Sequence, residues 1–281
     1  RVDWWRVRKH VGLVTGMSIV FTFIMMALLA SMISPHDPYQ QDLANRLVPP
    51  VWKDAGSWEH ILGTDYLGRD YLSRLFYGSR VALIMAFGVV AIAGTFGTIL
   101  GVVAGYFGGR VDWVISFFIN VRLSMPVVLV ALAVVAISGG SVTAVVIVLG
   151  ALLWDQFAVV SRGAVMQLRS REYVLAARAA GCSTFHILLR ELLPNISGPL
   201  IVVITLEMAH AILLEAALSF LGLGVQPPLP SWGLMISEGR NYLFFDPWLV
   251  SIPGLALFTL VFAINLVGDG VRDIAAMETR K

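Results

Sequence analysis

Long stretches without a charged residue dominate the pattern along the chain. Four of them contain no Asp, Glu, Lys or Arg, namely residues 10–36, 81–109, 123–154 and 247–268. A fifth, residues 195–221, is apolar apart from Glu207, His210 and Glu215. Because a span needs about 20 apolar residues and an unpaired charge at the bilayer centre costs several kcal/mol, these stretches predict membrane-spanning helices.

The third stretch is too long for one helix, and its Ser-Gly-Gly-Ser sequence at residues 138–141 predicts a turn between two antiparallel spans. The chain is therefore expected to be an all-α integral membrane protein with six transmembrane helices. The expected spans are residues 11–33, 81–105, 113–137, 142–160, 197–221 and 248–267. We expect two parts: residues 1–80, with a tail, the first span and an outer segment, and residues 81–281, a five-helix core that contains an inner loop at 162–195.

The distribution of Lys and Arg predicts the orientation. Thirteen of these residues fall on the side of the two termini and six on the other side, so both termini are expected in the cytoplasm. The first apolar stretch is too long for a secretory signal and is expected to be a retained anchor. Because the chain begins at Arg1 rather than Met, a short native segment is expected to precede it.

Composition supports a membrane protein and excludes other classes. Of the 281 residues 58% are hydrophobic, and Lys, Arg, Asp and Glu make up 14%, about half the share of a soluble domain. The net charge of +2 is too small for a nucleic-acid groove. The only cysteine, Cys182, excludes a disulfide or a multi-thiolate metal site within this chain and is expected to be a small residue in a helix turn.

Two outer segments are expected. In Ser34–Arg80, Thr64 or Asp65 could cap a helix whose apolar stripe is Leu72, Leu75 and Phe76, which predicts a helix lying flat on the membrane or on an external protein. In Gly222–Pro247, prolines at 227, 228 and 230 exclude a regular helix through the stretch that they occupy, and Trp232 and Trp248 suit the headgroup level.

The inner loop Arg162–Asn195 predicts a helical elbow. Residues 172–180 are strong helix formers, Gly181 interrupts the helix, Ser183 or Thr184 can restart it, and Pro194 is expected to end it. After Gly181, residues 185, 188, 189 and 192 form an apolar stripe at helical spacing. An amphipathic elbow without a span of its own suits either a protein groove or an ordinary surface loop.

Ionisable groups inside spans usually face a cavity or a partner helix. At 100° per residue, His210 and Glu215 lie about 60° and 80° to either side of Glu207, so all three share one face. This face is assigned to a translocation path or to a subunit interface. Two ligands at i, i+3 are too few to select a metal ion, so no metal site is expected there. Arg122 and Asp155 could pair or snorkel to the inner interface, and Pro126 is expected to bend the third span.

Specific strings resemble a known family. Residues 176–181 (AARAAG), followed after eleven residues by Leu193-Pro194, resemble the "EAA" loop of the membrane subunits of binding-protein-dependent ABC importers. Leu175 stands at the motif's Glu position and Glu191 at its Ile position, which leaves the backbone elbow intact and changes its charges. Further strings resemble the second permease of dipeptide, oligopeptide and nickel importers: LGTD at 62–65, GRD at 68–70, LSRL at 72–75, YG at 77–78, EAALSFLGLG at 215–224, QPP at 226–228, SWG at 231–233 and NLVGDGVRD at 265–273.

The resemblance implies a type I ABC importer permease of a bacterial or archaeal cytoplasmic membrane. Lys9, Lys53 and Lys281 are the only lysines and none lies in a G-x4-G-K-[ST] loop, so this chain is not expected to be an enzyme or to hold a cofactor. The resemblance implies that ATP and Mg²⁺ are held by two partner ATPases, which are expected to be different chains. It also implies a homologous second permease and an extracytoplasmic binding protein.

The resemblance also implies roles for individual residues. The elbow is expected to insert into an ATPase groove as a coupling helix, and the outer segment to receive the binding protein. The expected coupling residues are Tyr173, Ala176, Ala177, Arg178, Gly181 and Phe185. The expected docking residues are Asp65, Arg69, Asp70 and Arg74.

Several alternatives stay open at this point. Peptides are the leading substrate, but this branch also includes importers of nickel, glutathione, opines and oligosaccharides. An intramembrane hydrolase would need Asp269 and Asp155 as a buried pair, yet Asp269 lies where the last helix leaves the bilayer. An ion-coupled secondary transporter usually carries an internal repeat, and the six unequal helices show none.

Overall fold

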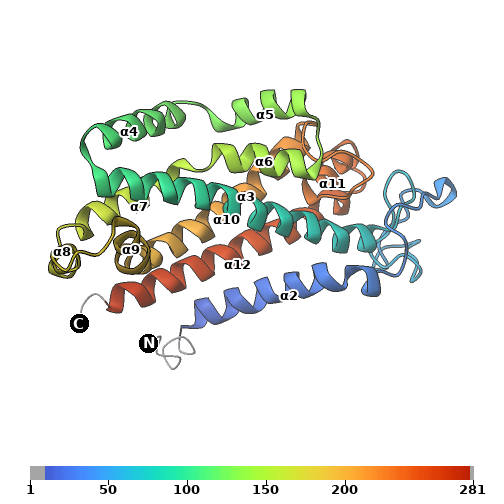
Figure 1. Cartoon of the computed structure of the whole chain (residues 1–281). Coiled ribbons are helices and arrows are strands. Elements are labelled where there is room, and N and C mark those ends of the chain that lie inside the picture. Colours follow the sequence, from blue (N-terminus) through green and yellow to red (C-terminus); the bar gives the residue numbers. More distant parts are fainter. Residues whose placement is uncertain (1–9, 279–281) are drawn as a thin grey trace.

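The computed structural model describes residues 10–278, and regular structure in that range is helical (Figure 1). The range contains no β-strand and only one isolated bridge, between Thr64 and Asp70. Five helical segments are long and apolar enough to cross a membrane, and a bent pair of helices makes a sixth if the two helices form one span. The all-α, six-span prediction is thereby confirmed. The basic tail at residues 1–9, together with Arg280 and Lys281, lies outside the described residues.

The first crossing, α2 (Val11–Ile33), agrees with the prediction, but the second does not. Helix α3 (Tyr71–Phe107) runs unbroken for 37 residues, or about 56 Å, whereas a bilayer core needs about 30 Å. The expected flat surface helix is therefore wrong: its apolar stripe belongs to the first turns of α3, and the expected division at residue 80 falls inside this helix. Its cap is Asp70, whose carboxylate accepts the N–H of Ser73 at 2.8 Å, and not Thr64 or Asp65.

The third crossing is sharply bent. Instead of one helix over 113–137, α4 (Gly109–Leu123) and α5 (Val127–Ser138) meet at 84°. Pro126 lies at this bend and caps α5, because it has no N–H for a helical bond and its carbonyl accepts the N–H groups of Leu129 and Val130. The predicted bend is confirmed, and it is large enough to separate two helices.

The fourth crossing consists of α6 (Val142–Leu152) and α7 (Asp155–Leu168), a 27-residue segment from Val142 to Leu168. Helix α7 packs closely on α3 because α3 has glycines at 97, 101 and 105. A Cβ on Gly101 would lie 2.0 Å from the Ser161 hydroxyl and 2.3 Å from the Ala158 carbonyl oxygen. Small residues spaced by four allow two helix backbones to approach closely.

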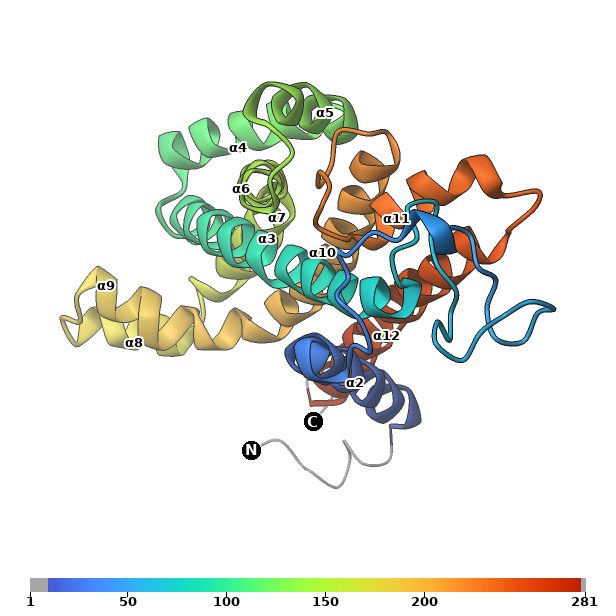
Figure 2. The same cartoon turned by 90° about the vertical axis from the view of Figure 1, so that its right-hand side faces the viewer.

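The last two crossings are α10 (Ser197–Phe220) and α12 (Trp248–Glu278), joined by a loop that holds α11 (Trp232–Gly239). Helix α12 lies beside α2 (Figures 1 and 2). Trp232 and Trp248 are 2% and 5% exposed, so their rings pack inside the protein and do not face lipid headgroups. The Trp232 indole N–H instead donates to the Leu75 carbonyl at 3.0 Å and ties α11 to α3.

The molecule has two distinct ends. The start of α2 and the end of α12 lie at the same end as the short helices α8 (Glu172–Ala179) and α9 (Thr184–His186). The outer segment and α11 lie at the opposite end (Figure 1). This arrangement places the predicted elbow and the predicted outer segments on opposite sides of the helical bundle.

Candidate functional site

The predicted elbow is a helical hairpin that projects from one side of the bundle (Figure 2). Helix α8 ends at Gly181, whose φ is +78°. The Cys182 N–H donates to the Ala177 carbonyl and the Gly181 N–H to the Arg178 carbonyl, which is the Schellman arrangement that ends helices at a glycine. Ser183 then caps α9 by accepting the His186 N–H at 3.3 Å. The predicted break and restart are confirmed.

Pro194 does not end the elbow, contrary to the prediction. After α9 the chain continues through a π-helical segment (Ile187–Leu192) and a short 3₁₀ turn (Pro194–Ile196) directly into α10. In the π-helical turn the Leu193 N–H donates to the Leu188 carbonyl, five residues back. A wider turn just before Pro194 accommodates a residue that has no N–H, so the helical path continues from α9 into α10.

The elbow has a buried and an exposed face. A small core of side chains anchors it to α3 and α7: Val102, Val165, Val174, Ile187, Leu192 and Ile196. The exposed face carries Tyr173 at 37% and Phe185 at 71% exposure, with Ala176 and Gly181 also exposed. Large apolar side chains on a projecting element form a surface suited to a protein partner.

Two predicted coupling residues differ from the others. Ala177 is half-buried and packs against the small core. The Arg178 guanidinium lies 4.8 Å from the centre of the Tyr106 ring, which is a cation–π contact with the end of α3. Arg178 thus links the elbow to its own bundle as well as presenting an exposed edge.

A cavity of about 740 Å³ opens between α3, α10 and the elbow. Its lining is apolar, with Phe185 and Leu189 from the elbow, Ile99 from α3 and Ile204 from α10, and Thr95 and Thr98 supply the hydroxyl groups. Such a lining offers little to bind a charged solute and suits hydrophobic chains or side chains.

The polar residues of the spans separate into two groups. Arg122 from α4 pairs with Asp155 from α7, with the Arg122 Nη2 3.3 Å from the Asp155 carboxylate, so of the two alternatives the pair is the one observed. Glu207 and His210 of α10 are electrostatic neighbours of this pair. The His210 Nδ1 is 3.3 Å from the Glu207 carboxylate, and the His210 side chain is 44% exposed while that of Glu207 is 7% exposed.

Glu215 has separate partners. Its carboxylate accepts the Ser219 hydroxyl at 2.7 Å, and the Ser219 oxygen accepts the Val225 N–H at 3.1 Å. Glu215 is 3% exposed. The helical spacing predicts that Glu207, His210 and Glu215 share one face of α10. In the structure they form two sites with different hydrogen-bond partners, one with Glu207 and His210 and the other with Glu215.

The four predicted docking residues are buried. Asp65, Arg69, Asp70 and Arg74 are 2%, 3%, 2% and 0% exposed, so their side chains cannot reach an external protein, and that prediction is wrong for these four. They are instead internal partners. Arg69 Nε lies 2.6 Å from the Asp65 carboxylate, and Arg74 forms a second ion pair with the same carboxylate.

Glu238 of α11 completes this network and was missed by the sequence analysis. Its carboxylate lies 3.1 Å from Arg69 and 2.9 Å from Arg74, and it accepts the Tyr66 hydroxyl at 3.2 Å. Burial lowers the pKa of Arg69, but the Asp65 and Glu238 carboxylates outweigh burial and hold that pKa above its ordinary value. The feature of the sequence that could have indicated Glu238 is charge balance. Two guanidinium groups, if buried, need a second carboxylate besides Asp65.

Comparisons with known proteins match this architecture. The family described as "Binding-protein-dependent transport system inner membrane component" matches residues 97–281, and the N-terminal TM domain of oligopeptide transport permease C matches residues 2–50. A dipeptide transport system permease of Haemophilus influenzae is 37% identical over 270 residues, which are 96% of this chain and 92% of that protein. A di/tripeptide transport system permease of Pseudomonas aeruginosa is 40% identical over 272 residues, 96% of this chain and 90% of that protein.

The fold also has a solved counterpart. A chain of the inward-facing MetNI methionine ABC transporter aligns with a TM-score of 0.60 and 18% identity, and the alignment covers 72% of this chain and 95% of that chain. At this identity the likeness concerns the fold alone. It places the described helices in the architecture of an ABC importer permease.

Proposed function

The chain belongs to the family of inner membrane components of binding-protein-dependent transport systems, and from this premise we propose that it carries di- or oligopeptides across the cytoplasmic membrane as one of two permease subunits. The observation that supports the peptide substrate is the 35–40% identity to dipeptide permeases over nearly the whole chain. The binding protein would select the peptide and deliver it to the outer end of the bundle.

ATP would be hydrolysed by two separate ATPase subunits. The elbow supports this assignment: it is anchored on α3 and α7 by its inner face, it exposes Tyr173 and Phe185, and it runs without a break into α10. A push on the elbow would therefore move α10 as a rigid body, and α10 carries Glu207, His210 and Glu215. A two-state movement of this kind needs different elbow contacts in the ATP-bound and ATP-free states.

The elbow end of the bundle would face the cytoplasm. The excess of Lys and Arg on that side of the chain supports this orientation. With the elbow inside, the buried Asp65, Arg69, Arg74 and Glu238 network would hold the outer segment in a fixed shape beneath the binding protein.

Reconstitution tests the proposal. The chain is purified with a second permease, two ATPases and a binding protein, placed in proteoliposomes and supplied with a labelled dipeptide. We expect uptake that requires ATP and every subunit. Uptake by this chain alone in an ion gradient would contradict the proposal that it is a permease subunit of an ATP-driven importer. ATP-dependent uptake of nickel, glutathione or a sugar, but not of peptides, would contradict the proposed peptide substrate.

A further inference from the structure

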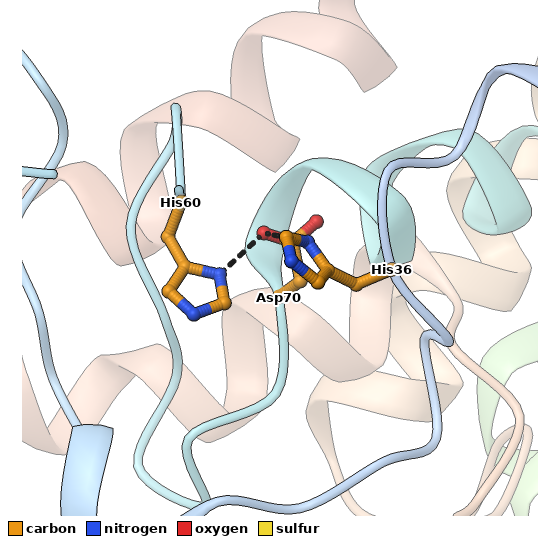
Figure 3. A group of neighbouring side chains, drawn as sticks. All are labelled: His36, His60 and Asp70. Carbon is orange, nitrogen blue, oxygen red and sulfur yellow. Dashed lines mark hydrogen bonds and ion pairs between the residues drawn. The ribbon is translucent and has the colours of Figure 1, made fainter. Parts of the chain in front are cut away.

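Three potential metal ligands converge at the outer end of the molecule, outside the groups considered so far. His36 follows α2, His60 lies in the outer loop, and Asp70 caps α3 (Figure 3). One ligand atom from each lies within 4.8 Å of the others. The three residues come from three separate segments, so anything bound between them would fasten those segments together.

One oxygen of the Asp70 carboxylate faces two histidine side chains. Its Oδ1 faces two imidazole nitrogens, the Nδ1 of His60 at 2.9 Å and the Nδ1 of His36 at 3.6 Å. The His60 contact is a hydrogen bond, whereas the His36 Nδ1 is buried and has no hydrogen-bond partner. A buried polar atom without a partner is costly, and a cation between the three atoms would satisfy all of them.

The spacing suits a small tetrahedral site. With metal–ligand bonds of about 2.0–2.1 Å, neighbouring ligands of a tetrahedral zinc ion lie about 3.3–3.4 Å apart. The two observed separations from Oδ1, 2.9 and 3.6 Å, lie on either side of this value, and the two histidine ligand atoms lie within 4.8 Å of each other. The binding of zinc would replace the proton now shared by His60 and Asp70.

The surroundings hold the ligands in place. The second Asp70 oxygen accepts the Ser73 N–H at 2.8 Å, so the helix cap does not use Oδ1, the oxygen that faces the two histidines. The backbone N–H of His36 donates to the Ser73 hydroxyl at 3.2 Å, and the backbone carbonyl of His60 accepts the Gly63 N–H at 2.8 Å. The His36 side chain is 34% exposed and gives solvent access to a fourth, open position.

We propose that His36, His60 and Asp70 form a divalent transition-metal site, with Zn²⁺ as the ion, that fastens the outer loop and the end of α2 to the start of α3. Two imidazoles and one carboxylate favour zinc over Mg²⁺ or Ca²⁺, which take mainly oxygen ligands. The positive end of the α3 dipole disfavours a cation, and the Asp70 charge offsets it. This inference does not depend on which solute is transported.

Zinc binding by the purified complex tests the site. The full transporter in detergent is freed of metal with a chelator, dialysed and titrated with Zn²⁺ alone, and bound zinc is counted by elemental analysis. The variants are His36→Gln, His60→Gln and Asp70→Asn, and the last keeps the helix cap because Asn caps as well as Asp. His186→Gln, in the elbow, is the matched control.

We expect the wild-type complex to hold one zinc ion more than the His36→Gln and His60→Gln complexes. Asp70→Asn should weaken binding by at least about tenfold, since even outer partners of metal ligands contribute that much. His186→Gln should bind zinc as the wild type does, and His60→Cys should restore binding because thiolate also ligates zinc. The proposal is overturned if the wild type binds no additional zinc, or if all three site variants bind it as tightly as the wild type.

Discussion

Glu238→Ala should destabilise the outer end of the molecule more than any exposed acidic substitution. In the native network two guanidinium groups are balanced by Asp65 and Glu238, and the side chains of Arg69 and Arg74 are 4% and 0% exposed. Without Glu238 both would share one carboxylate. Removal of one partner from a buried ion pair costs about 3–5 kcal/mol, and the Tyr66 hydroxyl would also lose its acceptor.

The assay is thermal unfolding of the detergent-solubilised complex together with amide hydrogen exchange. If the substitution destabilises the whole fold, we expect the melting temperature to fall by roughly 6–20 °C. If it destabilises only the outer end, the amides of residues 65–74 should lose protection against exchange while those of α10 keep it. Glu59→Ala, at an exposed position of the same outer segment, is the matched control and should stay within about 0.5 kcal/mol of the wild type. Equal unfolding and exchange in Glu238→Ala and Glu59→Ala would refute the reasoning.

Three further predictions concern the bundle and the elbow. Gly101→Ala should lower the free energy of unfolding by about 1–3 kcal/mol, because its Cβ would lie 2.0 Å from the Ser161 hydroxyl. Gly163→Ala, which has open space around it, is the control and should be neutral or slightly stabilising. Equal effects of the two substitutions in thermal unfolding would contradict the α3–α7 packing. Asp155→Leu should lower the free energy of unfolding by about 3–5 kcal/mol, because Arg122 would lose its carboxylate partner. The double variant Arg122→Met/Asp155→Leu should recover most of that stability. Absence of recovery would contradict a paired role for the two residues. Gly181→Val should strain the positive-φ turn by about 1–2 kcal/mol and lower the amount of peptide imported per ATP hydrolysed. Gly181→Asn is the control and should retain coupling, because Asn tolerates a positive φ. A wild-type ratio of peptide imported to ATP hydrolysed in Gly181→Val would contradict the role of the elbow.

The features that the sequence predicted correctly depend on local properties. Long apolar runs predicted α2 and α10 nearly to the residue, and Gly181 and Ser183 predicted the break and restart of the elbow. Each of these follows from hydropathy, from a positive φ or from a capping hydroxyl within a few residues. Such signals do not need knowledge of distant contacts.

Several of the incorrect predictions depend on distant contacts. Asp65 and Arg69 look like surface charges in a polar loop, and only their proximity to Glu238, about 170 residues further on, makes them internal. Trp232 looks like an interfacial residue until its N–H is seen to donate to Leu75. In these two cases a partner from another element overrides the local preference. Pro194 differs, because a local π-helical turn lets the helical path continue past it.

The coupling role of the elbow is the central claim, and cross-linking from Phe185 tests it most directly. A photoreactive benzoylphenylalanine replaces Phe185 in the elbow, which is 71% exposed, or, as the matched control, Phe244 in the segment between α11 and α12, which is 94% exposed. The account predicts that position 185 cross-links to an ATPase subunit with a yield that changes between the ATP-bound and ATP-free complex, and that position 244 does not. Absence of any ATPase cross-link from position 185, or a strong one from position 244, would contradict it.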